Sequence, residues 1–127
     1  MKKLTLIVVS LLTTLFSYSQ DFSRVIKATK SEFKDDKWVV TDTQYPTDMF
    51  VIIKDWDIKI GTSKLRTYDD PEKIVYEQHT CYSWKCIDAE GDKCMFMIKR
   101  FKPEVSTHIL YGVVYTQASL MYEYECE

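Results

Sequence analysis

Four cysteines, Cys81, Cys86, Cys94 and Cys126, offer the most reactive side chains in this chain of 127 residues. An even number of cysteines in an exported domain predicts disulfides before it predicts a metal site. We expect Cys86 to pair with Cys94 across a hairpin, which leaves Cys81 and Cys126 as a second pair. The two other pairings that four cysteines allow remain open.

Histidine supports neither a metal centre nor a nucleophilic site. His79 and Cys81 stand in an H-x-C spacing that His108 or Cys126 could complete. Zinc sites usually show a C-x₂-C or H-x₃-H pair, and this sequence has neither. It also lacks the G-x-S-x-G turn of serine hydrolases. We therefore predict no metal, no cofactor and no catalytic residue.

Neighbouring carboxylates are the remaining catalytic candidates. Glycosidases use two carboxyl groups about 5–9.5 Å apart, and Glu123 and Glu125 would share one face of a strand at about that separation. That face is expected to meet solvent, where charge protects a sheet against aggregation. A small carboxylate-dependent hydrolase is thus the least favoured hypothesis. The other acidic pairs are Asp35 with Asp36, Asp55 with Asp57, and Asp69 with Asp70.

Aromatic residues make up 14% of the chain, with nine Tyr, six Phe and three Trp. Such side chains suit an apolar ligand cup or a protein-binding surface, and they also suit the plain core of a small β-protein. The candidates for a concave sheet face are Trp38, Trp56, Tyr82, Trp84, Phe96, Tyr111, Tyr115, Tyr122 and Tyr124. The ligand-binding residues that we predict among them are Tyr82, Trp84, Phe96, Tyr111 and Tyr115.

The first residues have the pattern of a targeting segment. Lys2 and Lys3 precede the apolar run 4–16, which is too short to cross a bilayer. This pattern resembles the Sec signal peptide of a bacterial secreted protein, with a cut after Ser19 that leaves Gln20 as the new N-terminus. Because no cysteine follows the run to accept lipid, we expect a secreted or periplasmic protein without a lipid anchor.

The rest of the chain, residues 20–127, is predicted to be a single all-β domain. Residues 21–37 carry a loose apolar stripe that favours a short helix or an irregular lead-in. From Trp38 onward the apolar period is two, and the breaks between runs are too short for helices, so an antiparallel meander is expected. The meander closes into a small barrel or folds into a two-sheet sandwich. The nine expected strands are 38–42, 49–54, 56–60, 64–68, 73–78, 80–87, 93–101, 107–116 and 119–126.

The hairpin around Ala89-Glu90-Gly91 fixes a register. A three-residue loop that ends in glycine is typical of a type I turn followed by a G1 bulge. Cys86 then lies opposite Cys94, and Trp84 lies opposite Phe96. The reverse face of the same hairpin carries Met95 and Met97, which we expect to be exposed.

Together these features favour a secreted, non-enzymatic binding domain. Its partner is either a small apolar molecule or another protein, and the net charge of −2 disfavours nucleic acid. The alternative is a structural or envelope-assembly protein that acts through oligomerisation, by a sheet edge or by the methionine face. The overall outline resembles the calycin-like small barrels, although the Gly-x-Trp entry motif of lipocalins does not precede Trp38.

Overall fold

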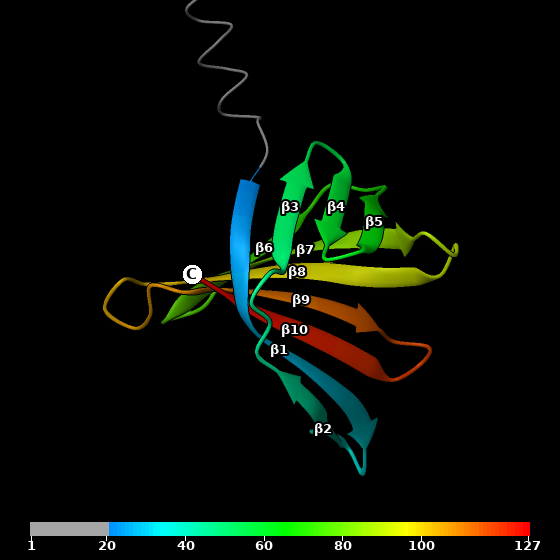
Figure 1. Ribbon diagram of the computed structural model, residues 1–127, viewed down its shortest axis with the longest axis horizontal. Helices are drawn as coiled ribbons and strands as arrows, with labels where there is room; N and C mark the ends of the chain where they lie inside the picture. The colour runs from blue at the N-terminus through cyan, green and yellow to red at the C-terminus, as the bar shows by residue number, and fades with distance from the viewer. Residues whose placement is uncertain (1–20) are drawn as a thin grey trace, which may run out of the picture.

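The computed structural model describes residues 21–127, so the expected signal segment 1–19 and Gln20 lie outside the described residues. Ten strands and no helix make up this part of the chain (Figure 1). It contains no helix that is long and apolar enough to span a membrane. In chain order the strands are β1 (Asp21–Lys34), β2 (Lys37–Gln44), β3 (Phe50–Lys54), β4 (Asp57–Ile60), β5 (Ser63–Thr67), β6 (Glu72–Val75), β7 (His79–Asp88), β8 (Lys93–Phe101), β9 (Ile109–Tyr115) and β10 (Leu120–Cys126).

The sheet closes into an antiparallel barrel of eight strands with two extra strands. The neighbours around the barrel are β1, β3, β4, β5, β7, β8, β9 and β10, and β10 pairs back to β1. The extra strands share an edge with a barrel strand: β2 continues beside β1 where β3 stops, and β6 lies beside the first half of β7. The all-β prediction and its nine strands from Trp38 onward are confirmed, and the closed barrel decides between the two expected architectures.

The helical or irregular segment expected at 21–37 is wrong, because residues 21–34 form β1, the longest strand. Its register with β10 shifts at a bulge between Val25 and Lys27, which interrupts the period of two. Its buried side chains include the small polar residues Ser23 and Ser31, which an apolar pattern does not reveal. The strand is therefore regular in its hydrogen bonding and irregular in its sequence.

Tight turns set the registers of the neighbouring strands. Asp35 and Asp36 both have positive φ, as a two-residue type I′ hairpin requires. The predicted loop at Ala89-Glu90-Gly91 is confirmed, since the Gly91 N–H donates to the Asp88 carbonyl and Gly91 has a φ of 86°. Cys86 lies opposite Cys94 as expected.

Inside the barrel, the end away from the 88–92 loop is filled by side chains. Phe96 and Tyr111 are each 1% exposed, and their rings stack with centroids 5.9 Å apart. The Tyr111 hydroxyl is hydrogen bonded to the buried Ser23 hydroxyl at 3.1 Å. Val25 on β1 and Ile98 on β8 complete this packed end.

The expected disulfides are absent from the structure, where all four cysteines are free thiols. The Asp88 N–H donates to the Asp92 carbonyl, so these two residues form a hydrogen-bonded pair of the hairpin. Such pairs recur at every second residue, and Cys86 with Cys94 is therefore a hydrogen-bonded pair as well. Cα atoms at such pairs are about 5.5 Å apart and the side chains diverge, which is unfavourable for a cross-strand disulfide. Burial raises the pKa of Cys86 to about 12 and that of Cys94 to about 11. Both side chains are thus protonated thiols at neutral pH.

Candidate functional site

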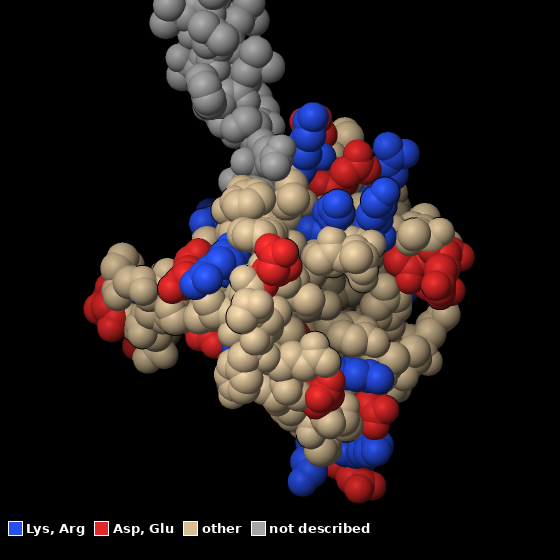
Figure 2. Space-filling model, viewed as in Figure 1, with Lys and Arg blue, Asp and Glu red and all other residues tan. Residues whose placement is uncertain are grey.

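A cavity of about 590 Å³ occupies the other end of the barrel interior. Its lining comes from the β4–β5, β7–β8 and β9–β10 turns and from the strands that lead into them. Figure 2 shows the molecule hollowed at this place. The lining residues are Ile60, Thr62, Ser63, Lys64, Leu65, Asp88, Ala89, Glu90, Asp92, Val113, Tyr115, Ala118, Leu120, Tyr122 and Tyr124.

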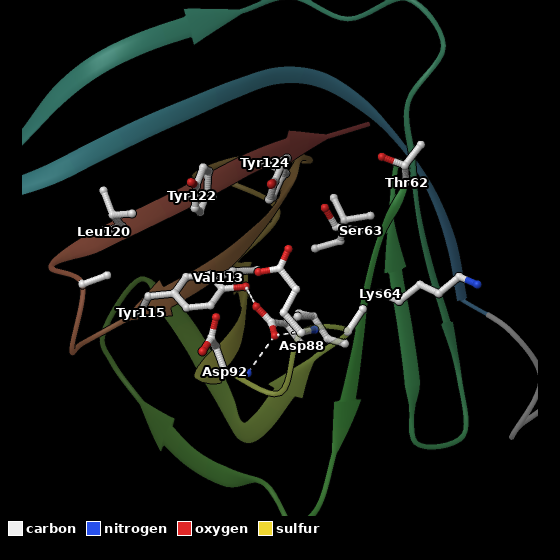
Figure 3. A pocket seen from close by; sticks show the side chains of 15 residues that line it. Thr62, Ser63, Lys64, Asp88, Asp92, Val113, Tyr115, Leu120, Tyr122 and Tyr124 are labelled. Atoms are coloured by element: carbon white, nitrogen blue, oxygen red, sulfur yellow. Dashed lines mark hydrogen bonds between the residues drawn. The ribbon is translucent and has the colours of Figure 1, made fainter.

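Aromatic and aliphatic side chains of β9 and β10 form one wall of the cavity (Figure 3). The alternation of β10 turns Leu120, Tyr122 and Tyr124 inward and leaves the residues between them on the outside. Tyr115 meets Tyr122 edge to face, with ring centroids 6.2 Å apart. This wall offers a broad apolar surface with phenol groups at defined points.

Asp88 anchors the loop at the cavity mouth. Its Oδ1 accepts hydrogen bonds from the N–H groups of Glu90 and Asp92 at 3.0 and 2.8 Å. Its Oδ2 accepts a hydrogen bond from the Tyr115 hydroxyl at 3.0 Å (Figure 3). The same carboxylate therefore holds both the loop and the inner tyrosine.

The environment keeps the Asp88 carboxyl ionised. Burial acts to raise its pKa, but the hydrogen bonds from Asp92, Tyr115, Glu90 and Gly91 together lower the pKa below its ordinary value. Burial, followed by the hydrogen bond to Asp88, raises the pKa of Tyr115. At neutral pH the cavity mouth thus carries a carboxylate and a neutral phenol.

Burial also raises the pKa of Tyr124 to about 12, with a smaller contribution from Tyr122. Within residues 21–127, neither the Tyr122 hydroxyl nor the Tyr124 hydroxyl makes a hydrogen bond to another protein group. They are available as donors or acceptors to a molecule in the cavity.

Of the five predicted ligand-binding residues, Tyr115 lines the cavity. Phe96 and Tyr111 belong to the packed end of the barrel. Tyr82 and Trp84 are half-buried on β7 and stack on each other, with centroids 6.2 Å apart. The structure does not bring these four residues to the cavity.

The other cavity residues differ in whether a sequence pattern predicts them. Tyr122 and Tyr124 were expected on an inward sheet face, and the alternation of β10 is the signal for them. Asp88 was not expected, because a carboxylate beside a turn is usually only a turn former. Asp88 belongs to the site because it accepts a hydrogen bond from Tyr115. Tyr115 lies on β9, and β8 lies between β9 and β7 in the sheet.

Candidate metal ligands do not gather as the H-x-C spacing would require. His79 stacks on Tyr76 with centroids 4.6 Å apart, and its ring is tilted against Phe101 with centroids 5.3 Å apart. His108 Nδ1 lies 2.9 Å from a Glu125 carboxylate oxygen in a half-buried pair. Between residues 21 and 127, one group of three acidic side chains has ligand atoms within 4.8 Å of one another: Asp88, Glu90 and Asp92.

The acidic pairs proposed for hydrolysis lie away from the cavity. Asp57 is exposed and forms an ion pair with Arg66 at 3.2 Å. Glu123 and Glu125 lie on the outer face of β10. Neither pair lines the cavity.

Comparison with protein-family models, with curated proteins and with solved structures finds no match to this chain.

Proposed function

We propose that this protein is an exported, non-enzymatic binding domain that takes a small, largely apolar molecule into the cavity of its barrel. The observation that carries this proposal is the cavity of about 590 Å³ with its wall of Leu120, Tyr115, Tyr122 and Tyr124. Small-molecule sites are usually concave, mostly apolar, and contain a few placed polar groups. The mouths of β-barrels are among the places where such sites occur.

Binding is favoured over catalysis by the kind of side chains in the cavity. The lining contains no histidine and no cysteine, the usual bases and nucleophiles. Asp88 is held by hydrogen bonds from the loop and from Tyr115, so its carboxylate has a structural task. We therefore favour a cavity that encloses and orients a ligand.

A titration with a neutral fluorescent probe tests this proposal. N-phenyl-1-naphthylamine brightens when it enters an apolar cavity, so a saturable rise in fluorescence is expected with residues 20–127. The variant Leu120→Trp fills part of the cavity and should weaken probe binding at least tenfold. Met121→Trp places the same side chain on the outer face of β10 and is the matched control. Equal binding by both variants, or no saturable binding by the native protein, contradicts the proposal.

Export is the second part of the proposal, and the pattern of residues 1–19 supports it. The mass of the intact protein recovered from the periplasm or the medium should correspond to a chain that begins at Gln20. A chain that keeps its first 19 residues inside the cell contradicts export without bearing on ligand binding.

Assembly with further copies of this chain is the second candidate function, and the free edge of β2 supports it. All eight residues of β2 are exposed, and Val40 is 57% exposed. The methionine face expected to serve this role is less open, because Met95 and Met97 are half-buried and Met97 Cε lies 3.2 Å from where a Cβ on Gly112 would stand. Light scattering should then show an oligomer that Val40→Lys dissociates, whereas a native monomer at high concentration contradicts assembly.

A further inference from the structure

The charges around the cavity are not balanced. Three carboxylates, those of Asp88, Glu90 and Asp92, line it together with a single cationic side chain, that of Lys64. In Figure 3 the Lys64 ammonium extends to the side away from the labelled tyrosines. Lys30 on β1 is the register partner of Tyr122, but it does not line the cavity. The mouth is therefore negative on the side of the 88–92 loop.

Two of the three carboxylates are available to a ligand. Asp88 uses both oxygens on the loop and Tyr115. The side chains of Glu90 and Asp92 make no ion pair or hydrogen bond with any residue of the described part. Both residues are exposed to solvent and also belong to the lining of the cavity. A positive group at this entrance would be attracted by all three charges at once.

The tyrosine wall suits the same kind of ligand. The faces of aromatic rings attract cations, and this attraction strengthens where water is partly excluded. Tyr115 and Tyr122 are half-buried and meet at 87°, so their rings line the space from two directions. The hydroxyls of Tyr122 and Tyr124 can in addition accept hydrogen bonds from an N–H donor.

From the aromatic cavity and the one-sided charge of its mouth, we infer that the ligand is a small molecule with a protonated amine on an apolar body. The amine lies at the mouth beside Glu90 and Asp92, and the apolar body lies along Tyr122, Tyr124 and Leu120. This inference rests on the proposed function, because it names the ligand class of the same cavity.

Two probes that differ only in charge test the inference. Dansylcadaverine carries a primary amine on an alkyl chain, and its N-acetyl derivative has the same ring and chain without the charge. Fluorescence titrations of residues 20–127 at low ionic strength should give a Kd for the amine at least tenfold lower than for the acetylated probe. Added salt should narrow this difference, because it screens the charges at the mouth.

A pair of double variants shows whether the mouth causes the preference. Glu90→Gln with Asp92→Asn should remove most of the preference for the amine and leave the affinity for the acetylated probe within about twofold. Asp70→Asn with Glu104→Gln removes the same number of charges at exposed positions outside the cavity lining and should keep the preference. Melting curves of both double variants establish that they are folded.

The outcomes separate the two proposals. Equal Kd values for the two probes overturn the amine inference and leave the proposed function in place. A preference that survives in the variant at Glu90 and Asp92 also overturns it, because the selectivity then comes from elsewhere. If neither dansyl probe nor the neutral naphthylamine binds, the proposed function itself fails, and the inference fails with it.

Discussion

The two ends of the barrel interior share strand β9 and have opposite characters. At the packed end, Phe96, Tyr111 and Val25 are almost completely buried, and a hydrogen bond ties Tyr111 to Ser23 across the interior. At the cavity end, the inward residues Val113 and Tyr115 of the same β9, together with those of β10, face open space. The sequence of a strand therefore determines which side chains point inward, but it does not determine whether other side chains pack against them.

The outer edge of β1 is divided between two partner strands. β3 pairs with β1 only over residues 21–24, and the remainder of that edge pairs with β2. In Figure 1, β2 extends away from β3, β4 and β5. The cavity lies between side chains of β4 and β5 on one side and of β9 and β10 on the other, and none of its lining residues belongs to β1, β2 or β3. An extra strand satisfies the backbone hydrogen bonds of β1 without closing the interior.

Truncating one aromatic residue at each end is the strongest way to break this comparison. Phe96→Ala should lower the free energy of unfolding by about 3–5 kcal/mol, because it leaves a void among packed neighbours. Tyr122→Ala should lower it by less than half as much, since that side chain already borders a cavity. Equilibrium unfolding in urea measures both values. Equal losses would mean that the cavity end is packed as tightly as the other.

Alkaline pH should destabilise the protein through its buried thiols. Burial raises the pKa of Cys86 to about 12, that of Cys94 to about 11 and that of Cys126 to about 12, against 9.0 for an ordinary thiol. Above pH 9 the unfolded chain loses these protons while the folded protein keeps them, so stability falls as the pH rises.

The expected loss is about 1.4 kcal/mol per pH unit for each such thiol between pH 9 and 11. Urea unfolding at several pH values measures the slope, and Cys126→Ala should make it shallower. Cys81, which is half-buried on the outer face of β7, provides the control substitution. An unchanged slope in Cys126→Ala would show that this thiol does not titrate as its burial requires.

Removing the Ser23 hydroxyl tests the polar contact at the packed end. Ser23→Ala should cost about 1 kcal/mol, the usual net value of a buried hydrogen bond. Ser119→Ala, in the β9–β10 turn, removes a hydroxyl without such a contact. If both substitutions have the same effect on the melting temperature, the bond between Ser23 and Tyr111 adds nothing to stability.

The smallest effect on stability is expected for a substitution at Gly112 on β9, the strand that the two ends share. A Cβ on Gly112 would lie 3.2 Å from Met97 Cε, which is the far end of a flexible side chain. Gly112→Ala should therefore change stability by less than about 1 kcal/mol and leave probe binding unchanged. A larger loss, seen by thermal unfolding, would show that Met97 is fixed and that the wall is rigid across both ends.

Much of this barrel could be predicted from alternation and turns. The hairpin with Cys86 opposite Cys94 follows from one glycine after a two-residue turn, and the inward tyrosines of β10 follow from period two. β1 could not be predicted, because its bulge shifts the alternation and its buried Ser23 gives no apolar signal. Without β1, the pairing of β1 with β10 that closes the barrel could not be predicted either.

The site was predictable only in part for a related reason. The tyrosines are local to two strands, whereas the rest of the lining comes from β4, β5 and the loop that Asp88 fixes, which are distant from those strands in the sequence. The disulfide expectation failed on a local detail, the hydrogen-bonded position of Cys86 and Cys94. Two cysteines that lie opposite each other in a hairpin do not necessarily have the geometry that a disulfide needs.

The pairing of β1 with β10 has a consequence for how the chain folds. It brings residues from the two ends of the described sequence together, with Val25 opposite Cys126 and the Glu127 N–H donating to the Arg24 carbonyl. Contacts between such distant residues form late and slowly, because the loop that they close is long. The barrel can close only after synthesis has passed its last strand. A chain bound for export would gain from that delay, because it stays open long enough to be threaded through a membrane pore.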